Sequence, residues 1–179
     1  FVHFGTDMPI ERTSVYSITE IKPGLIWVGT VEGLYAFENM KIRRIENFPE
    51  EKPRVFDILV LDDGDIVVTT KKKVFRYNGS VFTMIRTVDG RAVLGPHLVT
   101  QDDEGTIWLG SDEGVWQIDG LVAIPAIRET PALKKVVLHI LKDSHGDRWY
   151  LTGKNGIYRS KNGKVEQMDE VTDRYARTF

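Results

Sequence analysis

Short stretches of alternating apolar and polar residues recur along the chain, and glycine, asparagine or aspartate separates one stretch from the next. Alternation over about four to eight residues between such turn formers is typical of β-strands joined by hairpins. The first strand of each repeat is predicted at 15–21, 55–61, 97–101 and 137–141. The second strand is predicted at 25–30, 65–70, 106–111 and 147–152, and the third at 34–37, 74–77, 115–118 and 157–159. A fourth, more polar strand follows, as at 41–45 and 164–168.

The repeat is marked by a glycine in the turn between its first and second strands. These glycines stand at 24, 64, 105 and 146, at spacings of 40, 41 and 41 residues. Four short strands at a period near 41 match one blade of a β-propeller. The sequence therefore predicts an all-β fold, a β-propeller made of four-stranded antiparallel blades. About four blades are expected here, as part of a larger propeller.

One propeller segment is expected over residues 1–179. Its blades are predicted at about 10–48, 53–88, 93–125 and 135–169, and residues 170–179 would form a tail or begin a further blade. Because repeats need neighbours to bury their faces, we expect the chain to be part of a longer protein. The first and last blades would then expose apolar faces or pair with another chain.

The polarity of the strands predicts their order within a blade. The first two strands are the most apolar and the fourth is the most charged. We therefore expect the first two to lie between neighbouring blades and the fourth at the outer rim. The residue three positions after each marker glycine would then pack in the core between blades rather than stack on a ligand. These residues are Trp27, Val67, Trp108 and Trp149.

A longer motif surrounds these positions. Residues 26–30 read Ile-Trp-Val-Gly-Thr and residues 107–111 read Ile-Trp-Leu-Gly-Ser. A valine, isoleucine, aspartate and glycine at three-residue spacing are kept as Val137, Ile140, Asp143 and Gly146. In these residues the chain resembles the two-component regulator propeller repeat, from about residue 1 to residue 168. Departures from the repeat are Ile21 and Leu61 for the aspartate, Val67 for the tryptophan, and Lys71, Lys72 and Lys73 at the second turn.

The resemblance implies a function as well as a fold. Repeats of this kind form the periplasmic sensor regions of bacterial hybrid histidine kinases, notably those that sense polysaccharides. The chain would then be a non-catalytic periplasmic module, alone or as a homodimer. It would bind an oligosaccharide or another small extracellular ligand and relay the signal to a histidine kinase. The alternatives are a lyase-like propeller enzyme, with His97 as its candidate residue, and a protein-interaction scaffold.

Composition narrows the partners that the chain is expected to have. The formal net charge is −2, which argues against nucleic acid, since nucleic acid is bound by clustered positive charge. No apolar run approaches the roughly 18 residues of a membrane span, so membrane contact is expected only through parts outside this sequence. Cysteine is absent, which leaves the redox compartment open. No cofactor or metal is expected, because paired ligand spacing is lacking at His3, His97, His139 and His145.

The candidate ligand site is one face of the predicted propeller, near its central axis. On this face the connections between blades meet the turns between second and third strands. Cationic side chains there could hold a sugar acid or a sulfated glycan, and ordinary solvated turns are the alternative interpretation. No catalytic role is assigned to them in the sensor interpretation. The candidate residues are Arg54, Lys71, Lys72, Lys73, Arg91, His97 and Lys154.

Overall fold

The structure is a computed structural model that describes residues 13–127, 130–153 and 156–168. Within these ranges the protein is all-β, as predicted, apart from one 3-10 helix, η1 (Pro131–Lys134). The first unit contains β1 (Val15–Lys22), β2 (Leu25–Thr30), β3 (Leu34–Glu38) and β4 (Lys41–Arg44). The second contains β5 (Val55–Val60), β6 (Ile66–Thr70), β7 (Val74–Tyr77) and β8 (Phe82–Thr87). The third contains β9 (Pro96–Gln101), β10 (Ile107–Ser111), β11 (Gly114–Asp119) and β12 (Val122–Pro125). The fourth contains β13 (Val137–Lys142), β14 (Arg148–Thr152), β15 (Ile157–Lys161) and β16 (Lys164–Met168).

Within each unit, consecutive strands pair antiparallel, as the sequence predicts. The first and fourth units are separate four-stranded sheets. The second and third units differ from the prediction, because β8 pairs in parallel with β12 and joins them into one eight-stranded sheet. The Arg86 backbone N–H donates to the Leu121 carbonyl at this junction (3.0 Å). The outer edge of β8 carries unpaired backbone groups, and β12 satisfies some of them.

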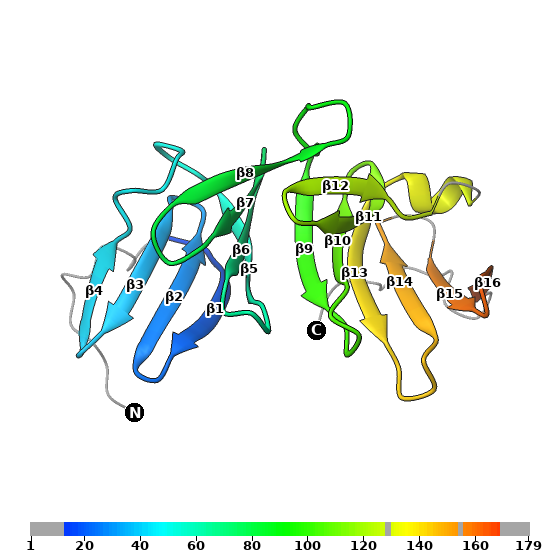
Figure 1. The fold of residues 1–179 in the computed structure, drawn as a ribbon, viewed down its shortest axis with the longest axis horizontal. Helices are drawn as coiled ribbons and strands as arrows, with labels where there is room; N and C mark the ends of the chain where they lie inside the picture. The colour runs from blue at the N-terminus through cyan, green and yellow to red at the C-terminus, as the bar shows by residue number, and fades with distance from the viewer. Residues whose placement is uncertain (1–12, 128–129, 154–155, 169–179) are drawn as a thin grey trace.

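The first strands of successive units lie next to one another. Strand β1 contacts β5, β5 contacts β9, and β9 contacts β13. In Figure 1 these strands occupy the middle of the molecule, and β4 and β16 lie at its opposite ends. The first and fourth units therefore run from the middle outward in chain order. The arrangement is propeller-like, while the number of blades in a complete ring and the residue limits of each blade stay predictions.

Three apolar clusters fill the space between successive units, and each one takes residues from two neighbouring units. The first is centred on Trp27, Leu34, Ile58 and Phe75, the second on Val67, Val74, Val99 and Leu109, and the third on Trp108, Val115, Val137 and Tyr150. The residue three positions after the marker glycine thus packs against the following unit in the first three units. The folded chain is held together by contacts between residues about one repeat apart.

The four predicted core positions do not share one environment. Trp27, Val67 and Trp108 are 6%, 0% and 7% exposed. Trp149 is only half-buried and belongs to none of the three clusters formed by the described residues. The difference follows from its place in the last described unit, because no following unit within the described ranges covers its indole ring. The sequence pattern could not show this, since the motif around Trp149 specifies the strand and not its neighbour.

The glycine two residues after Trp27 and Trp108 permits neighbouring units to approach closely. A Cβ atom on Gly29 would lie 2.8 Å from Val55 Cγ1, and one on Gly110 would lie 2.7 Å from the Val137 carbonyl oxygen. Either contact would force the next unit away. The glycine of the Ile-Trp-x-Gly motif therefore serves the packing between units, in addition to the packing by the tryptophan.

Candidate functional site

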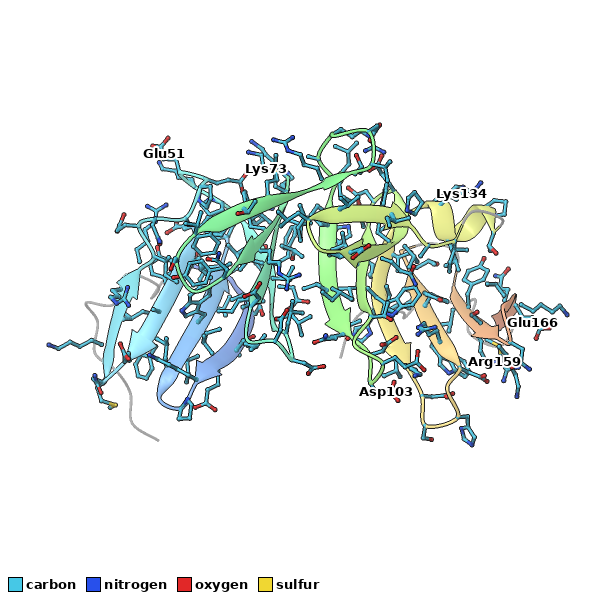
Figure 2. All side chains as sticks on the ribbon, in the orientation of Figure 1. Glu51, Lys73, Asp103, Lys134, Arg159 and Glu166 are labelled. Carbon is cyan, nitrogen blue, oxygen red and sulfur yellow. The ribbon has the colours of Figure 1, made fainter. Side chains whose placement is uncertain are left out.

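The connections between units and the turns between second and third strands share one face of the molecule, as predicted. In Figure 2, Glu51 and Lys73 lie at the upper edge, and Asp103, in a turn between first and second strands, lies at the lower edge. We call the two faces the upper face and the lower face. The sequence-predicted ligand residues that the structure describes belong to the upper face. Lys154 lies outside the described residues.

Four of the predicted residues line one groove on the upper face. This groove has a volume of about 540 Å³ and lies between the connection from the first to the second unit and the β6–β7 turn. We call it the basic groove; it is lined by Val31, residues 49–54 and residues 70–73. Its walls carry the cationic side chains of Lys52, Arg54, Lys71, Lys72 and Lys73, opposed by the carboxylates of Glu50 and Glu51. The excess of positive charge favours an anionic ligand.

The lysine turn is held in shape by Thr70. The Thr70 hydroxyl oxygen accepts from the backbone N–H groups of Lys72 (3.2 Å) and Lys73 (3.0 Å). The backbone N–H of Lys71 donates to the Arg54 carbonyl at 2.9 Å, which ties the turn to the opposite wall of the groove. Thr30 forms the same kind of turn in the first unit, where its hydroxyl accepts from Glu32 and Gly33. The hydroxyl keeps this turn although lysine replaces the usual glycine.

Most of the positive charge in the basic groove is free to meet a ligand. Lys73 pairs with Glu50 at an Nζ–Oε1 distance of 3.5 Å. Arg54, Lys71 and Lys72 are exposed, and none of them forms an ion pair within the described part of the chain. An anion entering the groove could therefore pair with three cations without breaking an existing salt bridge.

Arg91 and His97 form a second group, around the β10–β11 turn. Arg91 pairs with Glu113 at 2.8 Å and with Asp89 at 3.4 Å. His97 Nε2 lies 2.8 Å from Asp112 Oδ1. Both side chains already contact carboxylates of their own unit or its connection. The single site expected from the sequence therefore divides into the basic groove and a second group, Arg91 and His97, whose side chains already have acidic partners.

Three ring side chains, His97 among them, lie in a row across the first strands of neighbouring units, and sequence reasoning did not single out two of them. We call Tyr16, Phe56 and His97 the aromatic arc. The Tyr16 and Phe56 ring centroids are 5.3 Å apart in an edge-to-face arrangement, and the Phe56 and His97 centroids are 5.8 Å apart. The three residues come from the neighbouring strands β1, β5 and β9. Tyr16 is 47% exposed, and Phe56 and His97 are half-buried.

Asp57, which follows Phe56, fastens the same three strands to one another. Its Oδ1 accepts from the Ser17 hydroxyl (3.3 Å) and the Ile58 backbone N–H (2.9 Å), and its Oδ2 accepts from the Val99 N–H (3.0 Å). Burial raises the pKa of Asp57, although these hydrogen bonds and the nearby His139 act in the opposite direction. A carboxylate at this place holds the strands that carry the aromatic arc.

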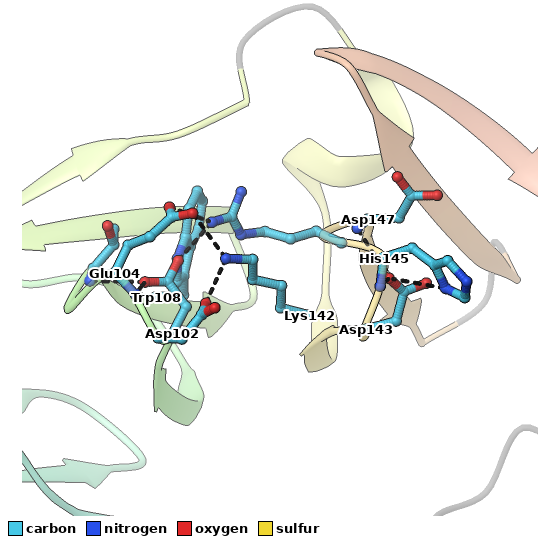
Figure 3. A network of polar contacts seen from close by, with 10 residues as sticks. Asp102, Glu104, Trp108, Lys142, Asp143, His145 and Asp147 are labelled. Atoms are coloured by element: carbon cyan, nitrogen blue, oxygen red, sulfur yellow. Dashed lines mark hydrogen bonds and ion pairs between the residues drawn. The ribbon is translucent and has the colours of Figure 1, made fainter.

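The lower face carries a different network, which joins the third and fourth units (Figure 3). Asp102 accepts from the Trp108 indole N–H at 2.8 Å and from Arg148 at 2.5 Å. The Arg148 guanidinium lies over the Trp108 ring at 4.1 Å, and Lys142 pairs with Glu104 at 2.9 Å and with Asp103. The carboxylates of Asp102, Asp103 and Glu104 all pair within this network, and of its donors the buried Arg148 Nε has no hydrogen-bond partner among the described residues. We therefore assign it to the stability of the junction and place the candidate ligand site on the upper face.

The described residues offer little for metal-dependent chemistry. Within the described ranges, no group of three or more His, Cys, Asp or Glu side chains is arranged to hold a metal ion. His139 is exposed and His97 has one carboxylate partner, Asp112.

Similarity to known proteins lies in structure alone. No protein-family model and no curated relative matches the sequence. The extracellular domain of a hybrid two-component system, BT4673 from B. thetaiotaomicron, superposes with a TM-score of 0.77 at 17% identity over 96% of this chain. The extracellular domain of the hybrid two-component system BT3049 superposes with a TM-score of 0.70 at 16% identity over 87% of this chain. Virginiamycin B lyase from Staphylococcus aureus gives a TM-score of 0.68 at 18% identity over 93% of this chain. These similarities show the fold, and the fold is the one that the repeat motif implies.

The chain spans about a quarter of the length of the two-component extracellular domains, 28% and 24% of those two chains. It covers 60% of the lyase. Among the residues that the structure describes, no helix has the length and apolar character needed to cross a membrane.

Proposed function

We propose that this chain is a ligand-sensing propeller module of a periplasmic two-component receptor, which binds an oligosaccharide on its upper face. The observation that carries the proposal is the basic groove, where Arg54 and the lysine turn converge, and Arg54 stands two residues before Phe56 of the aromatic arc. Binding sites commonly combine apolar or aromatic walls with a few polar groups that fix orientation. The likeness to extracellular domains of two-component systems supports the sensing role.

The position of the groove suggests how binding is transmitted. One wall comes from the connection between the first and second units, and the other from the β6–β7 turn. A ligand that binds both walls favours the arrangement of units in which they are close. Such a ligand can shift a receptor between two states only through different affinities for them. We propose that the signal reaches a histidine kinase in this way, alone or across a homodimer.

A saccharide-protection experiment tests this function. We expect trigalacturonate at millimolar concentration to raise the melting temperature of the chain, because a ligand that binds only the folded state stabilises it. The double variant Lys71→Ala/Lys72→Ala should bind about tenfold more weakly, since two exposed ion pairs contribute about 0.7 kcal/mol each. The matched control is Lys22→Ala/Lys41→Ala, which removes two exposed lysines outside the groove. The proposal fails if neither trigalacturonate nor neutral maltotriose shifts the melting temperature.

A lyase-like enzyme is the second candidate. It is favoured by the similarity in fold to virginiamycin B lyase and by the His97–Asp112 contact of 2.8 Å at the start of β9. A carboxylate partner orients a histidine and supports its use as a general base. Turnover of the cyclic peptide quinupristin, which is bound in that lyase structure, distinguishes this candidate from the sensor.

A further inference from the structure

We infer that the aromatic arc and the basic groove form one composite site for an acidic sugar unit. The apolar C–H face of the sugar ring stacks on Tyr16 and Phe56, and its acid group pairs with Arg54 and the lysine turn. This inference rests on the proposed function and assigns a ligand chemistry to its site.

The arc is produced by the same backbone irregularity in each unit. The pairing of the first strand with the second shifts by one residue between Val15 and Ser17, between Val55 and Asp57, and between Val137 and His139. In the third unit, Ser111 pairs with Pro96 and Gly110 with Leu98, which leaves His97 as the extra residue. A β-bulge re-aims a side chain out of the regular alternation. The residues at the bulges are Tyr16, Phe56, His97 and Leu138.

Three of these four side chains are rings, and they touch in sequence across three units. Tyr16 leaves nearly half of its surface in water, so its ring is accessible to a ligand in this chain. Aromatic rings present large, rigid apolar faces at a small entropic cost, which suits them to stack on a sugar ring. A row of rings on neighbouring strands can accept more than one sugar unit.

The platform is rigid before a ligand arrives. Asp57 bonds to Ser17 on one side and to the Val99 N–H on the other, and the Thr19 hydroxyl donates to the Ile58 carbonyl at 2.8 Å. Strands β1, β5 and β9 are thereby fixed next to the bulges that carry the rings. Binding to a rigid surface avoids the entropic cost of ordering it.

The groove selects the acidic member of the sugar class. Arg54 precedes β5 by one residue, so it connects the wall of the groove directly to the bulge at Phe56. The Arg54 carbonyl accepts from the Lys71 N–H, which holds the lysine turn next to the start of β5. A neutral sugar would leave Arg54, Lys71 and Lys72 without an anionic partner. A carboxylate or sulfate on the sugar ring would pair with them.

Binding of trigalacturonate and of its methyl ester separates the two parts of the site. The ester keeps the sugar rings and removes the negative charge. We expect Tyr16→Ala and Phe56→Leu each to weaken the binding of both ligands by about tenfold, because stacking does not need the acid. Lys71→Ala/Lys72→Ala should weaken only trigalacturonate. Tyr16→Phe should keep the affinity of the wild-type chain, since it retains the ring, and it serves as the control for Tyr16→Ala.

Each outcome decides a different claim. If the lysine variant weakens trigalacturonate while Tyr16→Ala and Phe56→Leu bind as the wild type does, the stacking role of the arc is overturned and the proposed function stands. If the wild type binds the acid and the ester equally, the acidic selectivity is overturned. If it binds neither but maltotriose raises the melting temperature, this inference is overturned and the proposed function stands; if maltotriose also has no effect, both fail. Tyr16 is exposed enough that its variants are expected to fold, which an unchanged melting temperature without ligand would verify.

Discussion

Trp108 and Trp149 occupy the same position in successive units, and their surroundings differ on one side only. Each indole N–H donates at 2.8 Å to an aspartate six residues earlier, Asp102 or Asp143. The guanidinium of Arg148, from the following unit, lies over the Trp108 ring at 4.1 Å. Arg148 stands directly before the core position of its unit, where the three earlier units have isoleucine. Over Trp149 lies Arg159 of its own unit, at 5.7 Å. The two tryptophans thus share the hydrogen bond to aspartate, and of the two only Trp108 contacts a residue of a following unit.

This difference predicts unequal costs for removing the two rings. Trp108→Ala should lower the free energy of unfolding by about 3–5 kcal/mol, since it empties a buried site between two units. Trp149→Ala should cost less than about 2 kcal/mol, because its side chain is only partly buried and no following unit among the described residues covers it. Unfolding in urea measures both variants. Equal losses would show that Trp149 is as well covered as Trp108.

At the scale of the element, the turns between first and second strands depend on an aspartate where the sequence has one. The side chain of Asp102 is 3% exposed and accepts from the backbone N–H groups of Glu104 and Thr106 besides Trp108 and Arg148. Burial by itself would raise the pKa of Asp102, but the hydrogen bonds from Trp108, Arg148 and the backbone outweigh it and lower the pKa to about 2. Through Asp102, the turn between β9 and β10 is therefore bonded both within its own unit and to Arg148 of the next unit.

The lowered pKa predicts a pH dependence. The ordinary value is 3.8, so the stabilisation by ionised Asp102 is complete above about pH 4 and is lost as the pH falls towards 2. We expect the free energy of unfolding of the wild type to fall more steeply over this range than that of Asp102→Asn. The variant keeps an acceptor for Trp108 and loses the titrating charge. Identical pH profiles for the two proteins would contradict the assignment.

Across the whole molecule, the order of the units decides which equivalent residues are buried. Ile18, Ile58, Val99 and Ile140 occupy one position in the first strands, as their pairing with Val28, Val68, Leu109 and Tyr150 shows. Ile58, Val99 and Ile140 are 4%, 5% and 3% exposed, because each packs against the preceding unit. Ile18 is 69% exposed. No unit precedes it among the described residues.

Replacing these isoleucines should therefore have different effects in this chain. Ile58→Ala should lower the free energy of unfolding by about 2–5 kcal/mol, the usual cost of a buried isoleucine. Ile18→Ala should change it by less than about 0.5 kcal/mol, as is usual for exposed positions. Thermal or urea unfolding of the two variants makes the comparison. A loss at Ile18 as large as that at Ile58 would mean that another segment or a second copy covers the first unit.

The ligand residues show how far sequence reasoning reaches. The positions of Arg54 and the lysine turn on one face followed from the order of strands and turns, and their shared groove agrees with that expectation. Arg91 and His97 lie on the same face but already contact acidic side chains, which could not be foreseen because Glu113 and Asp112 are neighbours only in the folded chain. Tyr16 and Phe56 were missed because a bulge is invisible in an alternating pattern.

The sequence by itself determined the period, the strands, their turns and the all-β class. These features depend on local alternation and on which residues tolerate a tight turn, and both can be read over a few positions. Only the tertiary structure decided the β8–β12 pairing, the half-buried state of Trp149, the grouping of cations and the aromatic arc. Each of these depends on contacts between different units, such as the Ser17–Asp57 hydrogen bond between residues 40 positions apart. The repeat motif determines the strands and turns of each unit, whereas the contacts between units determine which side chains lie together on the upper face.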